Sequence, residues 1–189
     1  MIHIHEVTGS SPVEPTIVMK TSAGILVYRL KSGEPEVFIV HPGGPFFAKK
    51  DDGVWSLPKG LIEGDDKPLT TAKREFREET SLAVPKGEYH ELGEVIYPRR
   101  DKKIVAWAVE GDLDASQLRS NTFEVEWPPR SGKKQSFPEI DRGGWFSLRE
   151  ASVKLFPPNL PFLERLANLL KVSFGPKKTP QPPEQNSLF

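Results

Sequence analysis

The sequence predicts an α/β fold with a mixed β-sheet. Segments with the apolar, β-branched composition of strands alternate with segments whose apolar residues recur at helical spacing, and there are no internal repeats. At 189 residues the chain is long enough for one domain with a substantial core and additional tails. We therefore expect a single domain over residues 19–174.

The two ends of the chain are expected to lie outside this domain. Residues 1–18 mix His, Gly, Ser and Pro without a sustained period, which predicts a flexible extension in which His3 and His5 are solvated rather than a metal pair. The sequence leaves open whether Met1 or Met19 is the natural start. Residues 175–189, GPKKTPQPPEQNSLF, are polar and proline-rich and are predicted to be disordered.

Charge and cysteine content exclude several classes of protein. Lys and Arg together number 26, as do Asp and Glu, so no excess charge favours long nucleic acids or anionic membranes. The chain has no cysteine, which excludes disulfides and Cys-ligated metals and fits a reducing cytoplasm. No apolar run reaches the roughly 18 residues of a membrane span, and no leader opens the chain. We expect a cytoplasmic protein that binds a small molecule; its oligomeric state is not predicted.

The first half of the domain is predicted to begin with two paired strands, residues 21–30 and 36–41, joined by a Lys-Ser-Gly-Glu-Pro turn. Residues 42–52, PGGPFFAKKDD, are expected to form a loop with two exposed phenylalanines. A short strand at 53–57 then leads into a Pro-Lys-Gly turn at 58–60.

The second half is predicted to contain a hairpin of strands 91–97 and 104–109. The connection over 111–138 is too rich in Pro, Gly and charge to be core, and a short helix is expected at 148–155. The last helix, 160–172, has apolar residues at helical spacing: Leu163, Leu166, Ala167 and Leu170.

The segment after residue 66 is predicted to be a helix that gathers carboxylates. Glu75, Glu78 and Glu79 fall within an arc of roughly 100° on a helix of 3.6 residues per turn. The neighbouring arc is apolar and suited to face a core: Leu69, Ala72 and Phe76. Like charges at these spacings repel, so a stable helix needs a countercharge. Mg²⁺ is a natural one because it takes carboxylate oxygens together with substrate phosphates.

The spacing around this helix is Gly60, five residues, Asp66, seven residues, and then REFREETSL over residues 74–82. It resembles the Nudix box, G-x5-E-x7-R-E-U-x-E-E-x-G-U, where U is apolar. The matching residues are Gly60, Arg74, Glu75, Phe76, Glu78, Glu79 and Leu82. Asp66 replaces a Glu and is expected to reach a metal only through water, whereas Ser81 replaces a Gly that would ease the helix end into a left-handed turn.

This resemblance to the Nudix hydrolase family, and to its MutT-like NTP pyrophosphohydrolases, implies an α/β/α sandwich. It also implies hydrolysis of the pyrophosphate linkage in a nucleoside diphosphate derivative, such as an NTP or a dinucleoside polyphosphate, with Mg²⁺ or Mn²⁺ as cofactor. By the same resemblance Glu75, Glu78 and Glu79 bind metal, and one of them is the base, for which Glu75 is the candidate. Arg74 is expected to pair with and orient a box glutamate.

Further site residues are suggested outside the helix. Glu139, six residues before Trp145 in EIDRGGWF, resembles the position where MutT-like proteins place a metal-binding or base Glu, although it is equally well an ordinary loop acid. Asn159 in FPPNLP resembles an Asn that contacts a purine base; capping of the last helix, with Pro161 in its first turn, is the favoured alternative. Lys59, in the turn before the box, is expected to bind substrate.

Trp127 and Arg130 are candidates for substrate binding in the long connection. Trp127 offers a stacking face, and Arg130 lies near further basic residues, Lys133 and Lys134. A mobile basic loop and a buried Trp127 are the alternatives. Tyr97-Pro98 lies near the substrate markers of some Nudix branches without matching their spacing, so no substrate is assigned from it.

Two other functional classes compete with hydrolysis. A non-hydrolytic Nudix-fold module that senses nucleotides would typically lose box acids or the arginine, which this chain keeps. A scaffold that uses its proline-rich segments as ligand peptides would need no box. The sequence does not predict the preferred nucleotide, the scissile phosphate, the number of metal ions or the identity of the base.

Overall fold

The computed structural model describes residues 19–97 and 101–173. The expectations for the N-terminal extension, for His3 and His5, for Pro98 and for the proline-rich tail lie outside the described residues. No helix in the described ranges is long and apolar enough to cross a membrane.

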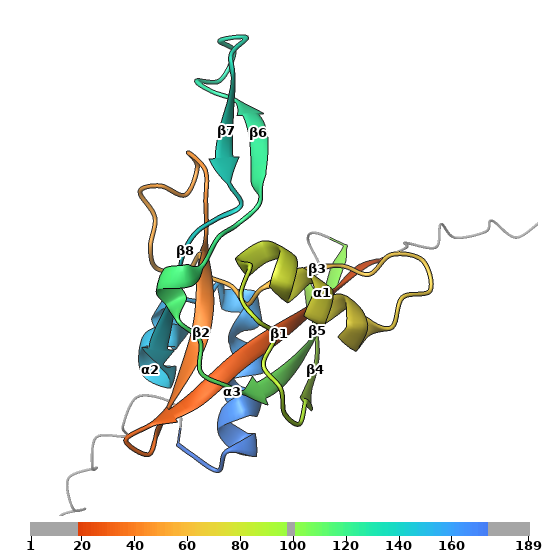
Figure 1. Ribbon diagram of the computed structural model, residues 1–189, viewed down its shortest axis with the longest axis vertical. Helices are drawn as coiled ribbons and strands as arrows, with labels where there is room; N and C mark the ends of the chain where they lie inside the picture. The colour runs from red at the N-terminus through yellow and green to blue at the C-terminus, as the bar shows by residue number, and fades with distance from the viewer. Residues whose placement is uncertain (1–18, 98–100, 174–189) are drawn as a thin grey trace, which may run out of the picture.

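The fold is built on a six-stranded mixed sheet with the order β4-β5-β1-β2-β8, in which β3 also pairs with β1 (Figure 1). The strands are β1 (Lys20–Lys31), β2 (Glu34–Pro42), β3 (Lys59–Leu61), β4 (His90–Tyr97), β5 (Lys102–Glu110) and β8 (Ile140–Ser147). β1 and β5 are parallel, and the other pairs are antiparallel. The predicted mixed sheet is therefore confirmed.

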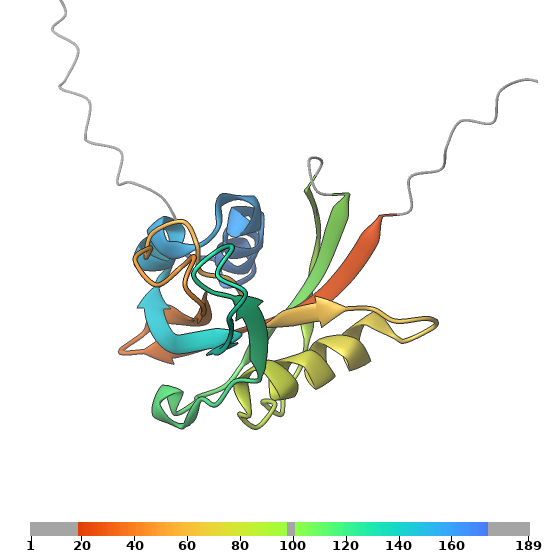
Figure 2. The same cartoon turned by 90° about the horizontal axis from the view of Figure 1, so that it is seen from above.

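Helices cover both faces of this sheet. The box helix α1 (Pro68–Thr80) lies on one face, and α2 (Leu148–Lys154) and α3 (Leu160–Leu169) lie on the other (Figure 2). Two short 3₁₀ turns, η2 (Ala115–Gln117) and η3 (Pro157–Asn159), complete the connections. The arrangement is the predicted α/β/α sandwich.

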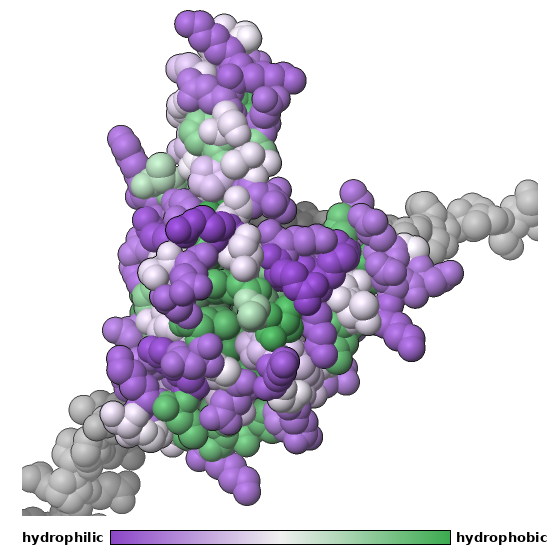
Figure 3. Space-filling model, in the orientation of Figure 1, coloured by the Kyte–Doolittle hydropathy of each residue, from purple (hydrophilic) through white to green (hydrophobic). Residues whose placement is uncertain are grey.

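Each helical layer buries its own hydrophobic cluster against the sheet. Phe76 and Ala72 of α1 are fully buried against β1 and β2, and Leu163 and Leu166 of α3 are fully buried against β4 and β5. α1 covers only part of its face. Figure 3 shows apolar surface over β1 and β2 beside the hydrophilic surface of this helix.

The chain direction at the end of α1 is set by Ser81. Its φ of 57° is left-handed, and its N–H donates to the Arg77 carbonyl at 2.8 Å. Serine thus adopts the turn that a glycine makes at this position more easily.

Three predicted features of secondary structure are wrong: the strand at 53–57, the turn at 58–60 and the end of the last helix. Residues 53–57 form only isolated bridges at Trp55 and Ser56, and Lys59 and Gly60 of the expected Pro-Lys-Gly turn instead belong to strand β3. α3 stops at Leu169 because Lys171 adopts a left-handed conformation, with φ 56°.

The connection between β5 and β8 also differs from the prediction. It contains a hairpin of β6 (Thr122–Glu126) and β7 (Lys134–Pro138), which projects from the body of the molecule (Figure 1). Half-buried Phe123 and Val125 alternate with exposed Glu124 and Glu126, which is the period of a strand with one covered face. The partner strand β7 is mostly polar, so the composition of this connection does not reveal the short alternation in β6.

Candidate active site

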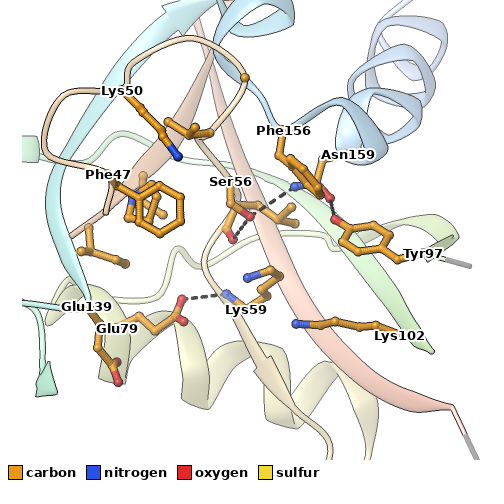
Figure 4. A pocket seen from close by; sticks show the side chains of 16 residues that line it. Phe47, Lys50, Ser56, Lys59, Glu79, Tyr97, Lys102, Glu139, Phe156 and Asn159 are labelled. Atoms are coloured by element: carbon orange, nitrogen blue, oxygen red, sulfur yellow. Dashed lines mark hydrogen bonds between the residues drawn. The ribbon is translucent and has the colours of Figure 1, made fainter. Parts of the chain in front are cut away.

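A cavity of about 450 Å³ opens beside the C-terminal end of α1 (Figure 4). It lies where β2 and β3 share one edge of β1: β2 pairs with residues 27–31 of β1, and β3 with residues 22–24. Its polar lining comes from separate elements: Lys50, Ser56, Lys59, Glu79, Lys102, Glu139 and Asn159. Its aromatic lining consists of Phe47, Tyr97 and Phe156. Four predicted site residues, Lys59, Glu79, Glu139 and Asn159, therefore meet in one cavity.

Glu79 is the box carboxylate that lines the cavity. Its Oε2 accepts a hydrogen bond of 2.8 Å from the backbone N–H of Lys59 at the start of β3 (Figure 4). Burial raises its pKa to about 7; the positive charge of Lys59 and this hydrogen bond oppose the shift, while Glu75 and Glu139 add to it. Helical spacing groups Glu79 with Glu75 and Glu78 on an arc beside the apolar one, but the side chain of Glu79 turns into the cavity, toward the strand that precedes the helix.

Glu75 is packed against the first residue of the box. A Cβ built on Gly60 would lie 1.9 Å from the carboxyl carbon of Glu75, so only glycine fits there. Burial raises the pKa of Glu75, and the neighbouring Arg74 guanidinium opposes this shift. The glycine of the pattern is thus required by the close approach of a glutamate to the backbone.

Arg74 joins the other two box glutamates. Its Nη1 lies 2.8 Å from Oε1 of Glu75 and 2.9 Å from Oε2 of Glu78. The Glu78 side chain is 48% exposed and that of Glu75 only 16%, so one guanidinium links an outer carboxylate to an inner one. This is the expected pairing of Arg74 with box glutamates.

The carboxylates at this end of the cavity have the chemistry to bind a hard divalent cation. Such ions take oxygen ligands, and the repulsion of Glu79 by Glu75 and Glu139 is the kind that a cation relieves. Within residues 19–97 and 101–173, no three ligating side chains are already gathered as a metal site. Arg74 occupies Glu75 and Glu78, so a cation would compete with this arginine for them. The donor set fits, and binding would require these ion pairs to rearrange.

Asn159 is buried at the opposite end of the cavity. Its Oδ1 accepts a hydrogen bond from the Tyr97 hydroxyl, and its Nδ2 donates to Ser56 Oγ at 3.3 Å (Figure 4). Although Asn159 is the N-cap residue of α3, its side chain makes no capping bond. The favoured capping interpretation is therefore wrong, and the side chain turns toward the cavity.

Several cavity residues were not predicted. Lys50 comes from the loop after β2, Lys102 begins β5, and the Tyr97 ring contacts Phe156 edge-on, with 5.6 Å between ring centroids. Strand alternation in the segment KKIVAWAV could have placed Lys102 and Lys103 on opposite faces of the sheet. Only the topology shows which of these faces carries the cavity.

Trp127 and Arg130 are not brought together with the other predicted residues. Trp127 follows β6, and its ring contacts Phe46 edge-on, with the centroids 5.4 Å apart. Arg130 is exposed at the turn of the hairpin, where Figure 3 shows a hydrophilic surface. The connection of Trp127 to the cavity is indirect, because Phe47, the neighbour of Phe46, lines it.

Comparisons with solved structures agree with this architecture. A C. elegans Ap4A hydrolase, solved as a binary complex, has a TM-score of 0.54 at 18% identity, covering 80% of this chain and 98% of that chain. The NUDIX domain of Shewanella oneidensis NrtR, complexed with ADP ribose, has a TM-score of 0.55 at 16% identity, covering 84% and 94%. The MutT protein from Methanosarcina mazei Go1 has a TM-score of 0.53 at 19% identity, covering 80% and 95%.

At these identities the likeness shows a shared fold. No curated protein sequence matches the chain. The model of the NUDIX domain, however, matches residues 19–166, which include the whole box helix and Glu139. The chain therefore belongs to the NUDIX family.

Proposed function

We propose that this Nudix pyrophosphohydrolase cleaves the pyrophosphate linkage of a nucleoside diphosphate derivative with the help of Mg²⁺ or Mn²⁺. The observation that carries the proposal is the position of Glu79. This buried carboxylate lines the cavity, and Glu75 and Glu139 are near enough to raise its pKa. A cluster of this kind suits the binding of a cation and the phosphates that it neutralises.

The proposed metal ligands are Glu75, Glu78 and Glu79. When bound, the cation neutralises charge on nonbridging phosphate oxygens. Arg74 holds Glu75 and Glu78 in place until the cation competes for them, which fits its proposed role as an orienting residue.

In the proposed reaction a water oxygen forms a new bond to one phosphorus, and the bond from that phosphorus to the bridging oxygen breaks. The water proton passes to a carboxylate, and both phosphate products leave. Glu75 is our candidate for this base, because Gly60 and Arg74 fix its carboxylate on two sides. Glu139 is the second candidate, because it lines the cavity immediately before β8 and its charge adds to the raised pKa of Glu79.

We assign substrate binding to the remaining lining residues. Lys59 supplies a positive charge beside the carboxylates, and Asn159 supplies an amide held by Tyr97 and Ser56. Trp127 and Arg130 are proposed to select the group beyond the cleaved diphosphate, with Trp127 acting through its contact with Phe46.

A hydrolysis screen tests this proposal. Nucleoside triphosphates, nucleotide sugars, ADP ribose and Ap4A are incubated with Mg²⁺, with Mn²⁺ and with chelator, and the products are separated. ADP ribose is included because the NUDIX domain of NrtR was solved in complex with it. Ap4A is included because another protein with this fold is named as an Ap4A hydrolase. We expect turnover of at least one compound that stops with chelator. Binding of a nucleotide with no turnover of any compound would instead identify a non-hydrolytic sensing module.

A further inference from the structure

Two lysines of the cavity project from the same face of the sheet. Lys59 on β3 is paired with Gly24 of β1, and Lys102 on β5 is paired with Lys20, on the opposite edge of β1. Positions 20 and 24 of a strand share one face because side chains alternate with a period of two. Figure 4 shows both lysine side chains directed into the cavity.

Gly24 allows Lys59 to pack closely against the backbone of β1. A Cβ at this position would lie 2.7 Å from the Pro58 carbonyl oxygen and 2.8 Å from Cβ of Lys59. The Lys59 stem therefore lies over the bare backbone of β1, and a larger residue at position 24 would displace it. In the sheet, β1 thus has Lys59 beside Gly24 on one edge and Lys102 beside Lys20 on the other.

Among the residues that the structure describes, three lysines line the cavity, and Lys50 lies near Phe47, apart from Lys59 and Lys102 (Figure 4). Glu79 and Glu139 lie at one end, and the ammonium groups of Lys59 and Lys102 follow in the direction of Tyr97 and Asn159 (Figure 4). Lys59 acts on Glu79 directly, since its charge lowers the pKa of that carboxyl. A phosphate chain cleaved at the acidic end would therefore pass onto the lysines.

We propose that Lys59 and Lys102 bind phosphates beyond the scissile pair, so that the preferred substrates carry three or more phosphates in a chain. This inference rests on the proposed function and narrows it to nucleoside triphosphates or dinucleoside polyphosphates over diphosphate sugars. Ammonium groups suit this task because they are compact point charges that donate up to three hydrogen bonds to phosphate oxygens.

The chain contains a matched control for Lys102. The next residue, Lys103, has the same charge but lies on the opposite face of β5, where its Nζ is 3.1 Å from Oε2 of Glu94. Replacing either lysine changes the net charge of the same strand by one. Only Lys102 lines the cavity.

The test measures binding of inorganic tripolyphosphate and pyrophosphate by calorimetry, with Mg²⁺ present, to the wild type, Lys102→Ala, Lys102→Met and Lys103→Ala. We expect the wild type to bind tripolyphosphate more tightly than pyrophosphate. Lys102→Ala should reduce this preference roughly tenfold or more, as for the loss of a hydrogen bond to a charged group. Lys102→Met keeps the apolar stem of the side chain and should behave like Lys102→Ala. Lys103→Ala should keep the wild-type ratio of tripolyphosphate to pyrophosphate affinity.

An unchanged ratio in both Lys102 variants, or an equal fall in Lys103→Ala, would overturn the inference. Because the measurement needs no turnover, its outcome is separate from that of the hydrolysis screen. Turnover with an unchanged ratio rejects only the role of the lysines. The expected ratios without turnover of any nucleotide would reject only the proposed function.

Discussion

The Gly60 backbone lies directly against the carboxylate of Glu75, and a Cβ at Gly60 would fall 1.9 Å from its carboxyl carbon. Two residues fifteen positions apart are thereby locked together, one on β3 and the other on α1. This contact explains in physical terms why the pattern begins with glycine.

Gly60→Ala is expected to displace Glu75 and to lower kcat by roughly a hundredfold, the scale of a displacement of about 1 Å in a catalytic group. The measurement is steady-state turnover with saturating Mg²⁺. Gly87→Ala is the control, because a Cβ there meets only ordinary contacts, the nearest at 3.5 Å. Near-normal turnover of Gly60→Ala would show that the position of Glu75 does not matter for catalysis.

Glu79→Gln should reduce turnover by orders of magnitude and raise the Tm of the cation-free protein. Glutamine still accepts the hydrogen bond from Lys59 N–H but removes a charge whose burial is unfavourable, as its raised pKa indicates. Mg²⁺ should raise the Tm of the wild type more than that of the variant. An equal Mg²⁺-induced shift in both proteins would show that Glu79 does not bind the cation.

Glu78→Gln should also reduce turnover by orders of magnitude, but with little effect on the cation-free Tm. This side chain is half-exposed, and its ion pair with Arg74 is the kind that contributes little to stability. Differential scanning calorimetry and turnover on the same sample test both parts. Full activity with Mg²⁺ would remove Glu78 from the set of metal ligands.

Tyr97→Phe is expected to lower the free energy of unfolding by about 1–3 kcal/mol, because it leaves the buried Asn159 Oδ1 without its donor. Tyr89→Phe is the comparison: its hydroxyl donates to the Pro85 carbonyl in a half-buried position, where water can replace it. That loss should be about 0.5–1.5 kcal/mol. Urea denaturation of both variants gives the two values. An equal or smaller loss for Tyr97→Phe would argue against the buried pair.

Trp127→Ala should weaken kcat/KM by about 1–3 kcal/mol for the preferred substrate while a small generic substrate is hydrolysed as before. The reason is that Trp127 contacts Phe46 beside the cavity residue Phe47. Phe46→Ala should reproduce the effect if the contact carries it. A uniform loss on both substrates together with a lower Tm would mean that Trp127 only supports the fold.

The sequence predicted those features that depend mainly on residues close together in the chain. The apolar stripe of Ala72 and Phe76 predicted how α1 packs, and the resemblance to the Nudix box implied that Arg74 pairs with a box glutamate. The apolar, β-branched composition of residues 21–30 and 36–41 likewise predicted the paired strands β1 and β2.

What the sequence did not predict depends on which surfaces face each other. Helical spacing places Glu79 beside Glu75 and Glu78, but the Lys59 N–H that draws it inward belongs to a strand twenty residues earlier. Asn159 likewise is a residue type that commonly caps a helix. Its side chain instead pairs with Tyr97, sixty-two residues away. Such pairings are set by topology and have no local signal.

Phosphorus NMR of the products formed from a nucleoside triphosphate or Ap4A, with the wild type and Glu79→Gln side by side, tests directly whether the carboxylate cluster is a cation-dependent active site. We expect the wild type to break a phosphate–phosphate linkage in Mg²⁺, chelator to stop the reaction, and Glu79→Gln to leave the substrate almost intact. Equal product formation by Glu79→Gln, or undiminished cleavage by the wild type in chelator, would contradict the assignment of this carboxylate cluster as a cation-dependent active site.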